Sequence, residues 1–220
     1  DADVAQPHLA ERQRRQRLRL GDGVVQLLGL VRGVARLARL AHAEALDGLD
    51  EQHILSATIE CISESTVDGI AGPIFYYSLF GPAGAFAYRT INTLDSMVGY
   101  HDDYFKDIGW MSARLDTAAN YIPARITAFL MVVSAKILGA DWKNSLNILQ
   151  RDHNKTFSPN AGYPMATMAG ALRVRLEKIG HYTLGDNQEP VTLEKCKKAI
   201  SIMKLTTLLF CTVVSVPVMS

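Results

Sequence analysis

The sequence predicts an all-α fold, a fragment of a polytopic helical membrane protein with kinked helices and a polar loop region. The first observation is an uncharged run of twenty residues, Gly69–Tyr88. A helix of that length would rise roughly 30 Å, which is the thickness of a bilayer core. The second is a shorter uncharged run, Ile126–Ala135, flanked by Arg125 and Lys136, whose long side chains can reach the membrane interfaces. The third is the uncharged stretch Leu205–Ser220.

Bulk composition agrees with this class without requiring it. Hydrophobic residues make up 48% of the chain and charged residues 20%, with a mean hydropathy of +0.06. These values suit a globular protein or a membrane protein with substantial loops. The net charge of +1 gives no strong field that would attract nucleic acid, so no nucleic-acid partner is expected. Cys61, Cys196 and Cys211 lie far apart, and their spacing indicates neither a disulfide framework nor a zinc site.

The first part of the chain differs from the rest. Residues 1–50 contain eight arginines and no lysine, whereas residues 51–220 contain six arginines and nine lysines. We therefore divide the chain into a basic, Arg-rich segment of uncertain origin, 1–48, and a membrane-embedded domain, 49–220. The spacing of apolar residues in the first segment predicts a basic amphipathic helix that could lie on an anionic membrane, and an ordinary surface helix explains the same pattern. The abrupt change in composition also fits a segment that is not native to this protein.

Glycine and proline interrupt the longest uncharged run. Gly81-Pro82 falls inside Gly69–Tyr88, so this helix is expected to be kinked or broken. A buried helical hairpin of a soluble protein that turns at Gly81-Pro82 is the alternative. Further helices are predicted over 50–67, over 112–140 as one helix or two around Pro123, and over 164–176. Residues 141–200 are the most polar part, and their lysines and arginines favour the cytoplasmic side of a membrane.

A polar stripe follows the long uncharged run. Asn92, Asp95, Ser96 and Gly99 recur at i, i+3, i+4 and i+7, so a helix would place them on one face. The stripe is either the solvent-facing side of a helix or a buried ligand-binding surface. A second polar segment, Ser158–Gly162, is rich in turn-forming residues, and its exposed amides could hold an anion. The signatures of P-loop, Rossmann and Ser-hydrolase proteins are absent from the sequence.

Six blocks, in order, carry a resemblance to a known family. They are Glu64–Gly69, Ala87–Arg89 with Asn92–Tyr100, Gly109–Asp116, Ile122–Arg125, Ser158–Gly162 and Met168–Leu172. The set resembles the adenosylcobinamide-phosphate synthase family of cobalamin biosynthesis, the CobD/CbiB proteins, over roughly residues 49–220. It does not extend to 1–48, where the early acidic, Gly-Pro-containing motif of the family is missing or replaced.

The resemblance implies a polytopic inner-membrane enzyme that makes an amide at the expense of ATP. Adenosylcobyric acid, a corrinoid carboxylate, would be joined to aminopropanol or its phosphate to give adenosylcobinamide or its phosphate. ATP with Mg²⁺ would be the co-substrate and ion, the corrinoid would be substrate rather than bound cofactor, and the lipid bilayer would be a partner. The polar region 141–200 would face the cytoplasm.

The family blocks supply the candidate site residues, and the residue types suggest their roles. Carboxylates can hold Mg²⁺ or move protons, so Asp68, Asp95 and Asp116 are the catalytic candidates, with Asp95 and Asp116 as the metal ligands. Guanidiniums can clamp phosphate or carboxylate groups bidentately, and amides and hydroxyls can orient substrate. The corresponding candidates are Arg89, Arg114, Arg125, Asn92, Ser96, Ser158 and Asn160.

Two departures and one topological problem qualify the resemblance. Ser65 stands where Asn is expected, and Met165 stands where Glu is expected, which removes a carboxylate beside the Ser158–Gly162 block. The alternative function is therefore a non-catalytic or decayed membrane relative that binds a ligand or serves a structural role. In addition, if the two uncharged runs each cross the membrane once, Asn92–Tyr100 and Ser158–Gly162 emerge on opposite sides. They can share a site only if one run is a broken, re-entrant hairpin or one block lies at membrane depth.

Overall fold

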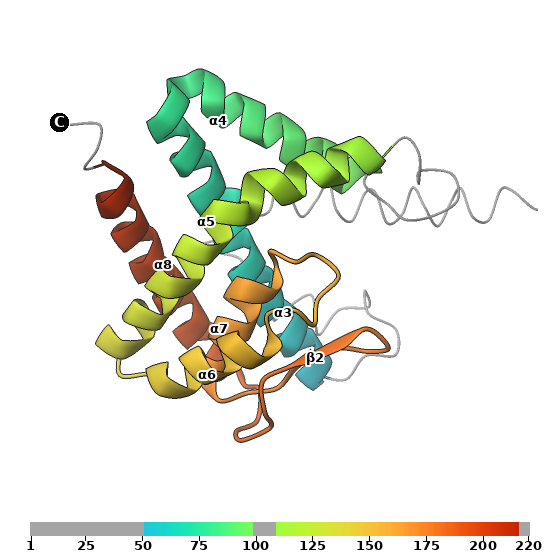
Figure 1. Cartoon of the computed structure of the whole chain (residues 1–220). Helices are drawn as coiled ribbons and strands as arrows, with labels where there is room; N and C mark the ends of the chain where they lie inside the picture. Colours follow the sequence, from blue (N-terminus) through green and yellow to red (C-terminus); the bar gives the residue numbers. More distant parts are fainter. Residues whose placement is uncertain (1–50, 99–108, 216–220) are drawn as a thin grey trace, which may run out of the picture.

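The computed structural model describes residues 51–98 and 109–215, so the segment 1–48 and the end of the polar stripe at Gly99 lie outside the described residues. Helices dominate the described part (Figure 1). In chain order the elements are α3 (Glu51–Ser65), η1 (Thr66–Ala71), α4 (Gly72–Val98), α5 (Trp110–Ile137), α6 (Trp142–Asp152), α7 (Gly162–Leu172), β1 (Leu176–Lys178), β2 (Tyr182–Leu184) and α8 (Leu193–Ser215).

Helix α4 is a hairpin of two arms. Gly81 lies at φ 65° and ψ −156°, a backbone conformation that is essentially restricted to glycine, and Pro82 follows it. The rings of Tyr76 and Tyr88, one on each arm, stack with their centroids 5.4 Å apart. A continuous helix would separate these residues by about 18 Å along its axis. The predicted break at Gly81-Pro82 is therefore confirmed, and the chain folds back on itself there (Figure 1).

Helix α5 continues through Pro123 as one helix. Proline has no N–H to donate to the carbonyl four residues earlier, which is that of Ala119. The Tyr76 hydroxyl donates to this carbonyl oxygen at 3.1 Å, so the acceptor that Pro123 leaves free is satisfied by the first arm of α4. This contact fixes the hairpin against α5.

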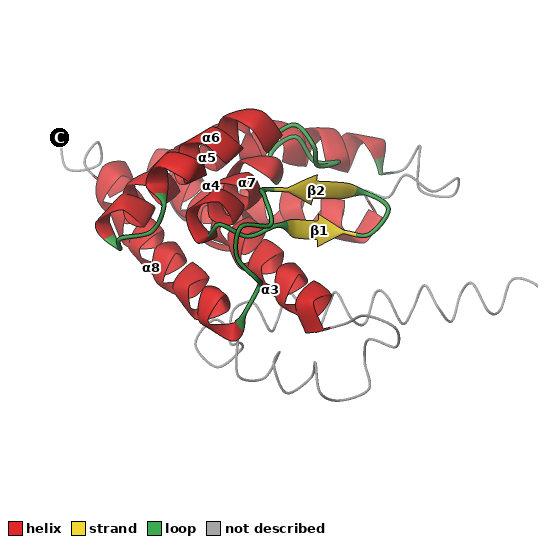
Figure 2. Cartoon of the chain, turned by 90° about the horizontal axis from the view of Figure 1, so that it is seen from below, coloured by secondary structure: helices red, strands yellow, loops and turns green. Residues whose placement is uncertain are grey.

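The polar region contains a small antiparallel hairpin that the all-α prediction missed. Strands β1 and β2 pair Leu176 with Leu184, and both leucines are fully buried (Figure 2). Glycines at positive φ, Gly180 and Gly185, allow the turn and the exit from the hairpin. The Glu177 N–H donates to Ser56 Oγ at 3.0 Å, which ties the hairpin to α3. Three-residue strands carry too little periodicity to be recognised in a sequence.

The larger core lies around α7. Its small residues allow close packing, and a Cβ on Gly170 would lie 2.7 Å from the carbonyl oxygen of Asn144 on α6. A second, smaller core joins η1 to α5 and α8 through Ala71, Leu130, Phe210 and Val214, and Ile74 and Phe75 of the first arm of α4 pack against it.

One helix among the described residues, α5, is long and apolar enough to cross a membrane, and 61% of its most apolar window is buried inside the protein. The uncharged run Gly69–Tyr88, expected to be a kinked or broken helix, forms the end of η1 and the α4 hairpin as far as Tyr88. Large apolar side chains are nevertheless exposed on three elements, for example Phe80 and Phe86 on α4, Phe129 on α5 and Leu208 on α8.

Candidate functional site

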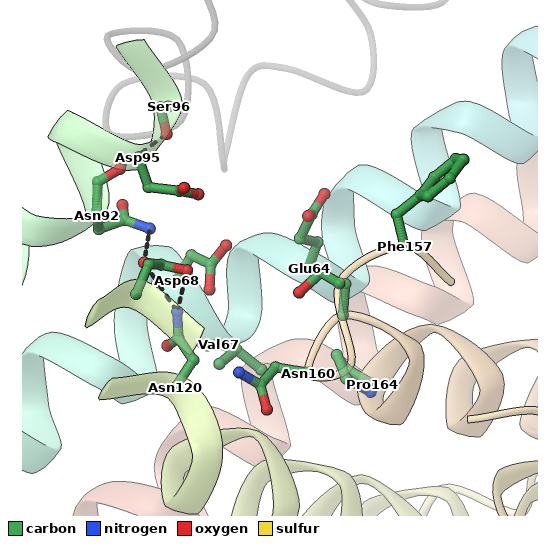
Figure 3. Close-up of a pocket in the computed structure, with 13 residues that line it drawn as sticks. Glu64, Val67, Asp68, Asn92, Asp95, Ser96, Asn120, Phe157, Asn160 and Pro164 are labelled. Atoms are coloured by element: carbon green, nitrogen blue, oxygen red, sulfur yellow. Dashed lines mark hydrogen bonds between the residues drawn. The ribbon is translucent and has the colours of Figure 1, made fainter. Parts of the chain in front are cut away.

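A cavity of about 460 Å³ lies where η1, the second arm of α4, the first half of α5 and the loop before α7 meet (Figure 3). Its lining residues are mostly acids, amides and hydroxyls: Glu64, Val67, Asp68, Asn92, Asp95, Ser96, Asp116, Asn120, Phe157, Ser158, Asn160, Ala161 and Pro164. The polar stripe and the Ser158–Gly162 loop therefore line the same cavity. The two blocks meet because α4 bends at Gly81, so that its second arm lines the cavity together with η1 and α5.

Four carboxylates from four consecutive elements face this cavity. Glu64 at the end of α3 and Asp68 on η1 are four residues apart, while Asp95 comes from α4 and Asp116 from α5. Figure 3 shows Asn92 and Asp95 on one side, Glu64 on the other and Asp68 between them. Among the described residues that line the cavity, none is lysine or arginine. Such a surface favours a cationic ligand, or an anionic one that brings a cation with it.

Asp68 has the most perturbed environment of these acids. Burial raises the pKa of the Asp68 carboxyl well above its ordinary value of 3.8. The negative charges of Glu64, Asp116 and Asp95 raise this pKa further, and Arg89 lowers it by a smaller amount. The short π-helical turn η1 interrupts the α-helical path at this residue, and such turns are frequent at functional sites. The raised pKa makes the Asp68 carboxylate a stronger base than an ordinary aspartate, which suits it to proton transfer.

Asp116 is held by two amides. Asn92 Nδ2 donates to its Oδ1 at 3.3 Å, and Asn120 Nδ2 donates to both carboxylate oxygens at 3.2 and 3.1 Å. The carbonyl oxygen of each amide is occupied in turn. Arg89 Nη1 donates to Asn92 Oδ1 at 3.4 Å, and the Tyr88 hydroxyl donates to Asn120 Oδ1 at 2.6 Å.

The Ser158–Gly162 loop is fixed by Asn160 and Gly162. Asn160 is 4% exposed; its Nδ2 donates to the Thr117 carbonyl on α5 at 2.8 Å, and its Oδ1 accepts from Arg125 Nη1 at 3.3 Å. A Cβ on Gly162 would lie 2.0 Å from the His153 carbonyl oxygen, so only glycine permits this close approach of the loop to the end of α6.

The predicted residues divide into three groups. The cavity is lined by Asp68, Asn92, Asp95, Ser96, Asp116, Ser158 and Asn160. Two arginines lie behind the lining: Arg89, which also donates to the Asp68 carbonyl at 3.2 Å, and Arg125. Arg114 is exposed and lies over the ring of Trp110, with its guanidinium carbon 5.6 Å from the ring centroid.

Arg125 has its guanidinium between two aromatic rings. Its guanidinium carbon is 3.5 Å from the centroid of Tyr121 and 4.3 Å from that of Tyr163, and Nη1 also donates to the Tyr121 carbonyl at 2.6 Å. These contacts make Arg125 an anchor for the loop. A role in clamping phosphate stays a prediction for Arg89, Arg114 and Arg125.

Two polar residues of the cavity lining, Glu64 and Asn120, were not predicted from the sequence. Glu64 opens the first family block and lies four residues before Asp68, so helical spacing could have identified it. Asn120 lies four residues after Asp116 on the same face of α5, and this pair makes the hydrogen bonds described above.

Met165 lies outside the cavity lining. It is 3% exposed, and its sulfur is 4.0 Å from the Tyr182 hydroxyl, which donates to Glu60 Oε2 at 2.7 Å. The second oxygen of Glu60 accepts from Ser56 Oγ at 3.0 Å. Met165 therefore packs where α3 meets the β1–β2 hairpin. A methionine at this position does not deprive the cavity lining of a carboxylate.

The donor set suits Mg²⁺ only together with a ligand. No group of three or more His, Cys, Asp or Glu in the parts of the chain that the structure describes is arranged to hold a metal ion. Mg²⁺, however, is usually bound by one or two carboxylates with water and substrate phosphates supplying the other oxygens. Asp95 and Asp116 provide two carboxylates at one cavity, so the residues present fit that mode of binding.

Comparisons with known proteins point in one direction. The family described as CobD/Cbib protein matches residues 25–209, a range that begins inside the segment 1–48. A probable cobalamin biosynthesis protein CobD of Methanothermobacter thermautotrophicus is 51% identical over 162 residues, covering 74% of this chain and 54% of the relative. The protein of the same description from Methanocaldococcus jannaschii is 43% identical, with 74% and 52% covered.

A cobalamin biosynthesis protein CobD of Dehalococcoides mccartyi is 45% identical over 143 residues, which cover 65% of this chain and 46% of the relative. The chain spans about half the length of the curated relatives it matches. No solved structure matches it.

Proposed function

Because the chain belongs to the CobD/Cbib protein family, we propose that it acts in cobalamin biosynthesis as an ATP-dependent amide ligase. Adenosylcobyric acid and aminopropanol or its phosphate would be the substrates, and adenosylcobinamide or its phosphate the product. The observation that supports this best is the cavity itself. Residues from five of the six sequence blocks, separated by up to about a hundred positions, line it or anchor its walls.

The reaction begins with a poor electrophile. The propionate carboxylate of the corrinoid would take the γ-phosphoryl group of ATP to give an acyl phosphate. The amine then attacks the acyl carbon, the C–N bond forms and phosphate leaves. Before this attack the ammonium form of the amino alcohol must lose a proton. The cavity residues described above can serve the amine side of this reaction directly.

The carboxylates would bind and deprotonate the amine. Glu64 and Asp95 attract an ammonium group into a cavity whose lining carries no positive side chain among the described residues. Asp68 is the candidate proton acceptor, because burial and the neighbouring carboxylates raise its pKa and so make it a stronger base than an ordinary aspartate. Asp116, held by two amides, keeps a fixed carboxylate at the cavity wall. Asp95 and Asp116 would hold Mg²⁺, which neutralises charge on the phosphoryl oxygens when bound.

The size of the cavity limits which parts of the proposed substrates can enter it. A cavity of about 460 Å³ accommodates the reacting arm of the corrinoid and the amino alcohol, while the macrocycle stays outside. The exposed face of Phe157, which is 76% exposed and points away from the carboxylates in Figure 3, offers an apolar contact at the rim.

We also propose that the protein is an integral membrane protein, with 141–200 on the cytoplasmic side. The large apolar side chains exposed on α4, α5 and α8 support this, since they offer apolar surface for contact with lipid. Carbonate-washed membranes provide the test. Recovery of the protein in the pellet is expected, and its release into the supernatant would contradict membrane insertion.

Complementation tests the ligase proposal. The gene, expressed in a strain that lacks cobinamide formation, should restore growth that depends on cobalamin synthesis. Purified protein in detergent should then form the amide only when ATP, Mg²⁺ and both substrates are present. A well-expressed, intact protein that neither rescues growth nor forms the amide would contradict the proposal and favour a ligand-binding or structural relative.

A further inference from the structure

Tyr88 contacts the site without lining it. This residue, on the second arm of α4, is 1% exposed, and its ring packs against Tyr76 inside the hairpin. Its hydroxyl reaches across to α5 and donates to Asn120 Oδ1 at 2.6 Å. Asn120, in contrast, lines the cavity and donates to Asp116. The hydroxyl is therefore one residue removed from the cavity wall.

The hydrogen-bonding capacities of the three groups allow one orientation of the Asn120 amide. An ionised Asp116 accepts hydrogen bonds and has none to give, so it must face the NH₂ group of the amide. The carbonyl oxygen then faces Tyr88, where the O–H is the donor it needs. Asn120 is 2% exposed, so its amide oxygen depends on a donor within the protein. Asp116 sets which end of the amide faces it, and the Tyr88 O–H holds the other end; without this O–H, the buried amide oxygen would lose the hydrogen bond that keeps the amide in place beside Asp116.

A displaced amide would change the site. It would withdraw Asn120 Nδ2 from the Asp116 carboxylate oxygens, which it contacts at 3.2 and 3.1 Å. The Asn92 amide alone would then hold Asp116, through a single contact at 3.3 Å.

We propose that Tyr88 is a positioning residue: its hydroxyl fixes the side-chain amide of Asn120, and this amide fixes the Asp116 carboxylate at the cavity wall. The expected effect of Tyr88 on kcat rests on the proposed ligase function, whereas its expected effect on the Asn120 side chain does not. Arg89 has the corresponding position on the other side of Asp116. Its Nη1 donates to the side-chain oxygen Oδ1 of Asn92, the second amide that holds this carboxylate.

The chain offers a matched control. Tyr76 lies on the opposite arm of the same hairpin, stacks on Tyr88 and also donates its hydroxyl to α5, but to the Ala119 backbone carbonyl. Tyr76→Phe therefore removes a comparable hydrogen bond from the same contact without touching the Asn120 side chain. Any effect that Tyr88→Phe and Tyr76→Phe share reports on packing of the hairpin, and any difference between them reports on the amide.

The first measurement is spectroscopic and independent of activity. The full chain is labelled with ¹⁵N-asparagine, and the side-chain NH₂ signals of Asn120 are assigned by their absence in Asn120→Ala. We expect these signals to keep their positions in Tyr76→Phe and to shift and broaden in Tyr88→Phe. Unchanged Asn120 signals in a folded Tyr88→Phe protein would overturn the proposal.

The second measurement is kinetic. In the amide-forming assay, Tyr88→Phe should lower kcat roughly tenfold with KM for the amino alcohol changed by less than about threefold, the scale seen for residues that orient a ligand-binding group. Tyr76→Phe should retain wild-type kcat. In an Asn120→Ala background, Tyr88→Phe should cause no further loss, because the group it orients is absent. Additive losses would contradict a role exerted through Asn120.

The two measurements separate the proposals. If the wild-type protein forms no amide, the ligase function fails and the NMR comparison alone decides the role of Tyr88. If the amide is formed but Tyr88→Phe matches Tyr76→Phe in kcat and in its Asn120 signals, the positioning role fails and the ligase function stands.

Discussion

The ring of Tyr88 occupies the space that a side chain on Gly72 would need. A Cβ at residue 72 would lie 2.2 Å from Tyr88 Cζ and 2.3 Å from its hydroxyl oxygen. The start of one arm of α4 thus meets the other arm at a position where only glycine fits. The contact closes the hairpin and holds the Tyr88 hydroxyl against Asn120.

Gly72→Ala should therefore destabilise the protein. Tyr88 is buried and cannot withdraw its ring, so we expect a loss of about 2 kcal/mol or more from overpacking. Gly69→Ala is the matched control, because a Cβ there meets no atom within 4 Å; it should be neutral or slightly stabilising. Thermal unfolding of both purified variants checks this. Equal melting temperatures for Gly72→Ala and wild type would show that the hairpin adapts.

The sequence predicted this hairpin better than it predicted the site. Gly81-Pro82 marks a break whatever surrounds it, since glycine reaches positive φ and proline cannot continue the backbone hydrogen bonds. Helical spacing likewise placed Asn92, Asp95 and Ser96 on one face. All three residues line the cavity, where Asn92 and Asp95 are partly buried and Ser96 is exposed.

The positions of the arginines and of the β-hairpin could not be read from spacing. Arg125 stacks on Tyr163, which is far away in sequence, and no local pattern indicates that ring. The β-hairpin over 176–184 depends on the burial of Leu176 and Leu184 against the rest of the fold. In both cases tertiary neighbours decide the outcome, and local propensity is too weak a signal to reveal them.

Met165→Glu should lower stability. The new carboxylate would lie in a buried position beside Glu60, whose oxygens already accept from Ser56 and Tyr182. The Tyr182 hydroxyl has one proton, so it cannot serve both acids. We expect a loss of about 2–4 kcal/mol for an unpaired buried charge.

Met165→Leu is the control for that substitution. It keeps the volume and the apolar character, and should cost less than about 1.5 kcal/mol. Denaturant unfolding would compare the free energies of unfolding of wild type, Met165→Glu and Met165→Leu, with one m-value fitted to all three proteins. A Met165→Glu variant as stable as wild type, or one with higher amide-forming activity, would show that the site at 165 is built for a carboxylate.

The Asp152 carboxylate should make stability depend on acid pH. Its side chain is fully buried, and although burial disfavours its charge, hydrogen bonds from Arg151, Lys155 and the Gly185 N–H lower its pKa from 3.8 to about 2. The charged form is thus favoured by folding. Its contribution is complete above about pH 4 and is lost as the pH falls through about 2; the difference between the two values corresponds to about 2 kcal/mol.

Asp152→Asn should remove this contribution. We expect the variant to be less stable than wild type at pH 7 and to lose less stability between pH 4 and 2. Asp186→Asn serves as control, because Asp186 is 43% exposed and its ion pair with Arg151 lies at the surface, where it is worth no more than about 1 kcal/mol. Parallel stability curves for wild type and Asp152→Asn over that pH range would refute the assignment.

Asp95→Asn should separate chemistry from folding at the candidate site. Asn has nearly the same shape as Asp, but it cannot hold a cation or attract an ammonium group by charge. We expect kcat/KM for amide formation to fall by roughly tenfold or more, the size of a lost charged contact, while expression and the circular dichroism spectrum stay at wild-type level. Asp186→Asn, which removes an exposed carboxylate outside the cavity lining, should retain full activity. Because both substitutions remove one negative charge, a loss confined to Asp95→Asn would locate the effect in the cavity, and a normal rate in Asp95→Asn would remove Asp95 from the reaction.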